Sequence, residues 1–199
     1  METHDFDWDS HFASLTAPFG MPNLPVTDIS YYVYESPTLG KLLLAADTQH
    51  TLVASTYVQT EEDQEKLLAK ISKQMSPRIL RRRDMFDQAI AELEEYLRGD
   101  RQTFDVSVDL SLTTPFQRQV LDDVRNNLTY GQVSTYSDVA EHIQHPKARR
   151  AVGTALGANP VCVFIPCHRV LGAGGKLSGY AGGLETKRRL LELEGVVTS

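Results

Sequence analysis

The stretch of this 199-residue chain that decides its fold is Asn159-Pro160-Val161-Cys162-Val163-Phe164-Ile165-Pro166-Cys167-His168-Arg169-Val170. Residues 161–165 are apolar and predict a short buried strand, which Pro166 ends because proline has no backbone N–H to donate. Cys167 follows, beside a histidine and an arginine. A thiol attacks as the thiolate, and nearby cationic or proton-accepting groups favour that form. Cys167 is therefore a candidate nucleophile.

The chain has two cysteines, and their settings differ. Cys162 lies inside the apolar run and is expected to be a small buried side chain. The same explanation fits Cys167 less well, because its neighbours are proline, histidine and arginine. Two cysteines five residues apart on a strand and its exit are poorly placed for a disulfide, so the sequence argues against a disulfide scaffold. No Cys or His cluster has the spacing of zinc ligands.

The residues before this stretch predict a set of helices. Thr114 is a good N-cap and Pro115 a good first helical residue, and apolar residues follow at helical spacing. Residues 135–138 fit a capping box and begin a short helix, and residues 147–158 form the next one. Two short helices joined by a tight turn suggest a helix-turn-helix, although many helical domains contain such a pair.

The first part of the chain alternates predicted strands with predicted helices. Strands are expected at residues 29–34, 41–46, 51–58 and 103–110, and helices at residues 61–75 and 84–97. We expect an α/β (α+β) chain in three segments. These are an N-terminal arm at residues 1–27, an N-terminal α/β domain at residues 28–112 and a C-terminal domain at residues 113–199.

The net charge of −6 argues at first against a nucleic-acid partner. However, residues 1–114 carry 10 Lys or Arg against 19 Asp or Glu, whereas residues 115–199 carry 10 against 7. Phosphate binding depends on local basic groups, so the second part remains compatible with DNA, even though simple drift of surface charge also explains the asymmetry. No apolar run is long enough to span a bilayer, and the acidic N-terminus does not resemble a signal peptide. We expect a cytoplasmic protein.

The motif at residues 165–170 resembles the active-site signature of the O6-alkylguanine-DNA alkyltransferases, also called methylated-DNA–protein-cysteine S-methyltransferases. Further segments resemble the same family, namely residues 36–46, 115–117, 130–136, 150–153 and 178–184. The resemblance implies a ribonuclease H-like N-terminal domain and a mainly helical, winged helix-turn-helix-like C-terminal domain. It also implies direct-reversal DNA repair, in which Cys167 takes an alkyl group from O6-alkylguanine once and irreversibly. O4-alkylthymine is a further candidate substrate.

The resemblance implies roles for individual residues. Cys167 is the nucleophile and methyl acceptor, His168 is joined to it through a water, and Glu194 orients His168. Tyr136 crowds a phosphate to assist base extrusion and donates a hydrogen bond to the base, while Arg150 fills the gap in the duplex. Taken singly, Arg150 is explained as a surface arginine, Tyr136 as a packing residue and Glu194 as a helix-surface charge.

The helix at residues 147–158 is expected to enter the minor groove, as such helices do in the family. Lys147 and Arg149 are expected to contact phosphates, and Ala148 and Gly153 are small enough for close approach to the groove floor. The substrate pocket is implied to include Asn159, Val170, Tyr180, Ala181, Gly182 and Gly183.

No cofactor is expected, because the damaged DNA supplies the alkyl group. No metal is expected either, because the chain has no cysteine before Cys162 for the structural zinc that some relatives carry. The expected partner is double-stranded DNA bearing the lesion, with no membrane and with the chain as a monomer.

Two other classes of function compete with this interpretation. A winged-helix protein without activity would bind DNA to flag lesions or regulate transcription, but it has no use for Cys167, His168 and Glu194 together. A Cys/His hydrolase would need an oxyanion hole, for which the sequence shows no signature.

Overall fold

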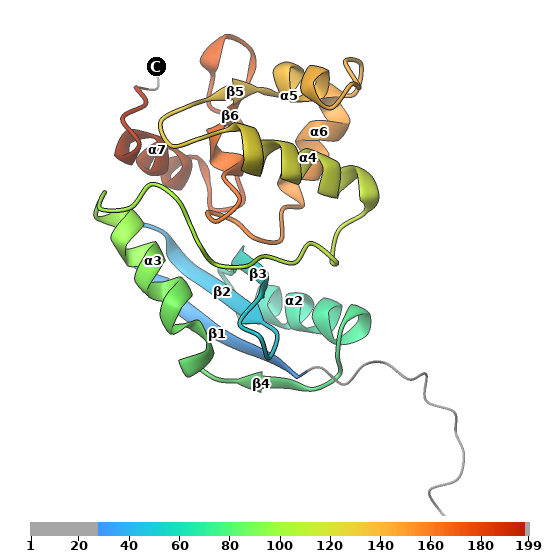
Figure 1. Ribbon diagram of the computed structural model, residues 1–199, viewed down its shortest axis with the longest axis vertical. Coiled ribbons are helices and arrows are strands. Elements are labelled where there is room, and N and C mark those ends of the chain that lie inside the picture. Colours follow the sequence, from blue (N-terminus) through green and yellow to red (C-terminus); the bar gives the residue numbers. More distant parts are fainter. Residues whose placement is uncertain (1–27, 198–199) are drawn as a thin grey trace, which may run out of the picture.

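The computed structural model describes residues 28–197, with a sheet and its two helices in one part and a mainly helical second part stacked on it (Figure 1). This mixed architecture confirms the predicted fold class. The predicted N-terminal arm, residues 1–27, lies outside the described residues. Among the helices formed by residues 28–197, none is long and apolar enough to cross a membrane.

The first part is built on a four-stranded sheet with the order β3-β2-β1-β4. β1 (Ile29–Ser36), β2 (Gly40–Ala46) and β3 (Leu52–Tyr57) are antiparallel neighbours, close to their predicted bounds. β4 (Ile79–Arg81) pairs in parallel with β1 and was not predicted, because three residues are too few to show an alternating pattern.

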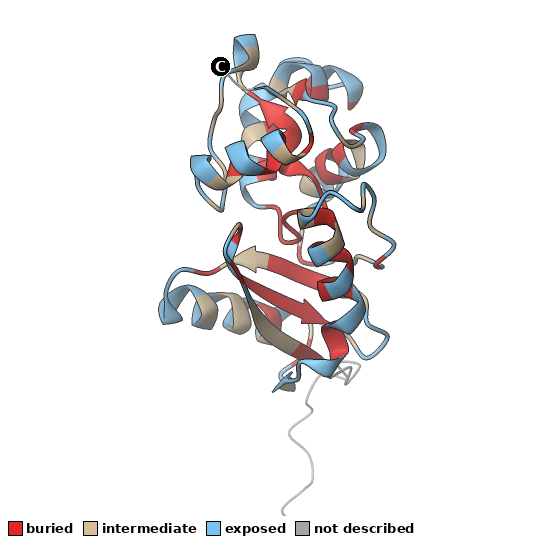
Figure 2. Cartoon of the chain, turned by 90° about the vertical axis from the view of Figure 1, so that its left-hand side faces the viewer, coloured by how far each residue is buried: buried red, intermediate tan, exposed pale blue. Residues whose placement is uncertain are grey.

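Helices cover both faces of this sheet. α2 (Glu61–Gln74) begins at a capping box, and α3 (Asp87–Leu97) follows the 3₁₀ turn η1 (Asp84–Phe86). In β2, Leu42 and Leu44 belong to the core cluster that contains α3, whereas Leu43 and Ala45 belong to the cluster that contains Ile71 of α2. β2 is therefore buried on both faces, and Figure 2 shows the middle of the sheet coloured red for buried residues.

The second part is mainly helical, as predicted. It contains α4 (Pro115–Asn127), β5 (Ser134–Thr135), α5 (Tyr136–His142), α6 (Arg149–Gly157), η2 (Cys167–Arg169), β6 (Val170–Leu171), η3 (Ala173–Gly175) and α7 (Leu184–Leu193). Capping boxes begin α4 at Thr114 and α5 at Thr135, which confirms both predicted helix starts. α4, α5 and α6 pack on one another, so the predicted helix pair α5–α6 forms a compact unit.

Two predicted strands are wrong. Residues 103–110 make only the isolated bridge of Val108 to Leu52, and their alternating apolar side chains pack into the core without extending the sheet. Residues 161–165 form a tight turn, in which the Ile165 N–H donates to the Val161 carbonyl over 2.9 Å and Val163 has a φ of 73°. Apolar composition indicates burial, but it does not distinguish a buried strand from a buried turn.

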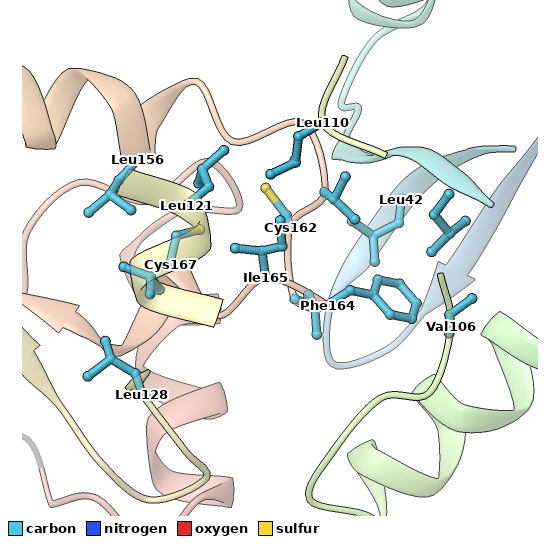
Figure 3. Packing of buried hydrophobic residues seen from close by; sticks show 14 of the residues in the cluster. Leu42, Val106, Leu110, Leu121, Leu128, Leu156, Cys162, Phe164, Ile165 and Cys167 are labelled. Atoms are coloured by element: carbon cyan, nitrogen blue, oxygen red, sulfur yellow. The ribbon is translucent and has the colours of Figure 1, made fainter. Parts of the chain in front are cut away.

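This turn is anchored on the edge of the sheet. The Ser55 N–H donates to the Pro160 carbonyl, and the Cys162 N–H donates to the Ser55 carbonyl, both over 2.7 Å. Phe164 extends from the turn toward Val106 and the sheet (Figure 3), and its ring packs on Phe104 with centroids 4.7 Å apart. One hydrophobic core therefore runs through both parts and fixes the turn that precedes Cys167.

Candidate active site

Cys167 is the first residue of η2 and lines a cavity of about 330 Å³. The residue is only 6% exposed. The cavity wall is formed by Tyr136, Gly153, Leu156, Gly157, Cys167, Gly179, Tyr180 and Ala181. These residues come from α5, α6, η2 and the loop before α7, so the fold brings together segments that the sequence analysis associated only by resemblance.

The side chain of Asn159 holds the turn and contacts the thiol. Its Nδ2 donates to the Ile165 carbonyl and to Cys167 Sγ, each over 3.1 Å, and its Oδ1 accepts from the Val161 N–H over 2.9 Å. Hydrogen bonds from Cys162 and Asn159, together with the charge of Lys187, lower the pKa of Cys167 against the opposing effect of burial. These contacts favour the thiolate, which is the nucleophilic form.

Lys187 is a buried charged residue near Cys167 that the sequence analysis missed. Its side chain is fully buried, and Nζ donates to the carbonyls of Val170 and Ser178 over 2.6 and 3.0 Å. Burial lowers the pKa of Lys187 to about 8. A sequence signal existed, because this lysine lies at helical spacing from Leu190 and Leu191 on the apolar face of α7, where a charge needs a specific partner.

His168, the residue after Cys167, forms a buried pair with Glu194. His168 Nε2 lies 3.0 Å from Glu194 Oε1, and both side chains are fully buried. Burial lowers the pKa of His168 and outweighs the opposing effect of Glu194, so the imidazole is neutral and donates from Nε2. His168 Nδ1 is buried without a hydrogen-bond partner among residues 28–197, which leaves it free to accept a proton.

Arg169 supplies the permanent positive charge that keeps Glu194 ionised. Its Nε lies 2.9 Å from Glu194 Oε2 and its Nη2 lies 2.8 Å from Oε1. Burial alone would raise the pKa of Glu194, but the hydrogen bonds from His168 and Arg169 lower it to about 2. The predicted association of His168 with Glu194 thus has a third member, which the sequence analysis noted only as a neighbour of Cys167.

Tyr96, from α3 in the first part of the chain, also reaches this pair. Its hydroxyl donates to Glu194 Oε1 over 2.5 Å and lies 3.4 Å from His168 Nε2. Tyr96 is fully buried. The sequence gives no signal for this contact, because it joins residues 98 positions apart in the chain.

The residues predicted to bind DNA lie on α5 and α6 or directly before α6. Arg149 and Arg150 are exposed on α6, Lys147 is exposed just before it, and Ala148 is the half-buried N-cap. Tyr136 begins α5, and its hydroxyl lies 3.0 Å from Ser178 Oγ. A Cβ on Gly153 would lie 3.7 Å from the ring of Tyr136, which is ordinary contact. A second hollow of about 260 Å³ is lined by Thr135, Tyr136, Ser137, Arg149, Arg150, Gly153 and Ala173.

The six residues predicted for the substrate pocket divide into two groups. Tyr180 and Ala181 line the cavity, whereas Asn159, Val170, Gly182 and Gly183 lie outside its wall. Val170 is fully buried in β6, and its carbonyl holds Lys187. Within residues 28–197 no group of three or more His, Cys, Asp or Glu side chains is placed to hold a metal ion.

Fold and site together define a class of protein, in which a buried cysteine with a lowered pKa opens onto a cavity beside a helix-turn-helix. Two family models match the chain. Residues 29–110 match the 6-O-methylguanine DNA methyltransferase ribonuclease-like domain, and residues 115–196 match the DNA binding domain of the same family. The chain belongs to the 6-O-methylguanine DNA methyltransferase family, which confirms the resemblance noted in the sequence.

Individual relatives agree with this assignment. The methylated-DNA–protein-cysteine methyltransferase of Methanosarcina acetivorans is 38% identical over 165 residues, which are 83% of this chain and 97% of that relative. The protein of the same name from Haemophilus influenzae is 36% identical over 82% of this chain and 86% of its own length. The structure of Mycobacterium tuberculosis OGT in complex with DNA superposes with a TM-score of 0.70 at 34% identity, covering 83% of this chain and 92% of that chain.

Proposed function

We propose that the chain repairs DNA by transferring a methyl or larger alkyl group from O6-alkylguanine to its own Cys167, once and irreversibly. The observation that carries this proposal is the position of Cys167, whose pKa is lowered and which faces a cavity beside the exposed arginines of α6. Family membership supports the same reaction, since the relatives are named methylated-DNA–protein-cysteine methyltransferases.

The cavity is reached only by a base that has left the duplex. A guanine inside the stack does not present its O6 to a buried thiol, so the damaged nucleotide must rotate out of the helix. Arg150 is exposed on α6, and we propose that its side chain fills the gap in the duplex, while Tyr136, which lines the cavity, assists extrusion of the base. We infer that α6 enters the minor groove, with Ala148 and Gly153 near its floor and with Lys147 and Arg149 on phosphates.

The chemical step that we propose uses the relay of cysteine, water, histidine and glutamate that the family resemblance implies. The Cys167 thiol loses its proton through one water to His168 Nδ1, and the resulting imidazolium is stabilised by Glu194. The thiolate attacks the alkyl carbon, the new S–C bond forms, and the C–O6 bond breaks with its electron pair on the guanine. Tyr136 donates a hydrogen bond to the leaving base. A thioether is not hydrolysed under mild conditions, so each chain acts once.

The finer parts of the proposal rest on the sequence and the family. We propose a monomer that acts in the cytoplasm on double-stranded DNA, with O4-alkylthymine as a second candidate substrate. We also propose the segment boundaries expected from the sequence, with an arm at residues 1–27, a first domain at residues 28–112 and an alkyltransferase domain at residues 113–199.

The test is to incubate the chain with a duplex that carries one O6-methylguanine and to measure its intact mass and its binding. The proposal predicts a gain of one methylene per chain in the wild type and none in Cys167→Ala, with binding retained in both. Binding without a gain of mass would indicate the alternative function, a lesion-binding protein without activity. The absence of both binding and a gain of mass would refute the proposal.

A further inference from the structure

We propose that Tyr57, the last residue of β3, sets the size of alkyl group that the cavity accepts, an inference that rests on the proposed function. Tyr57 belongs to the N-terminal sheet and is not part of the cavity wall. It acts through the loop at residues 178–183, which contributes Gly179, Tyr180 and Ala181 to that wall. Tyr57 is therefore a positioning residue for substrate selection.

The first contact of Tyr57 is with Tyr180. The two hydroxyl oxygens lie 3.1 Å apart, and the two rings meet edge to face with centroids 5.5 Å apart. Tyr180 in turn stands edge to face with the ring of His168, with centroids 6.3 Å apart. The Tyr180 ring is thus held between Tyr57 of the N-terminal sheet and His168, and it forms part of the cavity wall.

The second contact is with Gly182, directly after the wall residues. A Cβ built on Gly182 would lie 2.6 Å from Cζ and 2.7 Å from Cε1 of Tyr57, closer than real Cβ atoms approach their neighbours. The tyrosine ring therefore rests on the backbone at Gly182. A side chain at this position would force either the ring or the loop to move.

The loop has few other restraints on this side. Its beginning is held by the second part of the chain, since Ser178 accepts from Lys187 Nζ and contacts the hydroxyl of Tyr136. Residues 176–183 form no helix or strand. The position of Tyr57 is in contrast fixed by the sheet, because the neighbouring Ser55 bonds to the turn before Cys167 through two backbone hydrogen bonds. Tyr57 therefore places the Tyr180 wall at a set distance from the thiol.

An alkyl group larger than methyl must fit between Cys167 and this wall. Removing the Tyr57 ring leaves the loop free to move outward. The rate of transfer should therefore rise more for a bulky alkyl group than for a methyl group. The comparison is between a duplex carrying O6-benzylguanine and one carrying O6-methylguanine, with the rate of mass gain measured for each. We expect Tyr57→Ala to raise the benzyl-to-methyl rate ratio by about tenfold, the range in which pocket contacts discriminate substrates.

Matched variants separate this effect from a loss of folding. Tyr32→Ala removes a half-buried tyrosine of the same sheet, away from the cavity, and should leave the ratio unchanged. Tyr57→Phe removes only the hydroxyl and should raise the ratio by less than Tyr57→Ala does. Gly182→Ala should slow both reactions in the wild type and have little further effect in Tyr57→Ala, where the clashing ring is absent.

The outcomes are distinct. A raised ratio in Tyr57→Ala together with non-additive effects of Gly182→Ala supports the inference. The inference is overturned if both rates fall in parallel with an unchanged ratio, or if the effects of the two substitutions are additive. If Tyr57→Ala does not fold, the benzyl-to-methyl ratio in Tyr57→Phe decides between these outcomes. A wild type that transfers no methyl group refutes the proposed function itself, whereas a reactive wild type with an unaltered Tyr57→Ala ratio refutes only the role of Tyr57.

Discussion

Replacing Glu194 with glutamine removes a buried negative charge while keeping the shape of the side chain. In the folded chain the pKa of Glu194 is about 2 against an ordinary value of 4.5, because His168 and Arg169 donate to the carboxylate. A pKa shift of this size corresponds to about 3 kcal/mol of stability. The substitution also leaves the buried Arg169 without a charged partner. We therefore expect Glu194→Gln to lower the free energy of unfolding at neutral pH by about 3 kcal/mol.

The pH dependence gives this prediction its sign. A carboxyl group whose pKa is lowered by folding stabilises the fold above its unfolded pKa, and this contribution is lost as the pH falls toward the folded pKa. The difference in the free energy of unfolding between wild type and Glu194→Gln should thus become smaller as the pH falls from about 5 to about 2.

Urea unfolding, followed by far-UV circular dichroism across this pH range, measures the difference between the two chains. Glu185→Gln is the matched control, since Glu185 lies on α7, the helix whose C-cap is Glu194, with a side chain 61% exposed that pairs with Arg188 and Arg189 at the surface. This substitution should leave stability nearly unchanged. A Glu194→Gln chain as stable as the wild type at neutral pH, or a difference that does not vary with pH, would refute the reasoning.

Three further predictions concern DNA, the thiol and the product. Arg150→Ala should slow repair of a lesion in duplex DNA and leave the rate of reaction with free O6-benzylguanine unchanged, because the arginine acts on the duplex. An equal loss of rate in both assays contradicts this role. Asn159→Ala removes the hydrogen-bond donor 3.1 Å from Cys167 Sγ and should raise the pKa of the thiol. The pH profile of the reaction of Cys167 with iodoacetamide should therefore move to higher pH, and an unchanged profile contradicts the role of Asn159. Stoichiometric methylation should lower the Tm by a few degrees, because a methyl group added to a side chain only 6% exposed overpacks the site and destabilises the fold by about 1–3 kcal/mol. Differential scanning calorimetry of the alkylated and the free chain measures the two Tm values, and an equal or higher Tm after methylation contradicts the prediction.

Sequence reasoning succeeded where structure is determined locally. The capping boxes at Thr114 and Thr135 are set by residues three positions apart, so the starts of α4 and α5 follow from the sequence directly. The strands predicted at residues 41–46 and 51–58 are likewise neighbouring segments, and they pair in antiparallel fashion as β2 and β3. The setting of Cys167 beside His168 and Arg169 identified the candidate nucleophile, and the structure places Glu194 on both of these neighbours.

The errors come from contacts between segments distant in sequence. Residues 103–110 alternate as a strand does, but their apolar side chains are buried in the shared core and only one bridge forms. The positive φ of Val163 reverses the chain where a strand was expected, since the sheet edge at Ser55 holds the turn. Tyr57 and Tyr96 meet partners 123 and 98 positions away, and no local pattern in the sequence encodes such distances.

The central claim is that Cys167 accepts the alkyl group and that each chain acts once. The most direct test is to titrate the chain with an excess of duplex carrying O6-trideuteromethylguanine and to locate the label by fragmentation mass spectrometry. We predict that labelling stops at one trideuteromethyl group per chain, with fragment ions placing the group on Cys167 and leaving Cys162 unmodified. Repair of more than one lesion per chain, or a label on any other residue, would contradict the account.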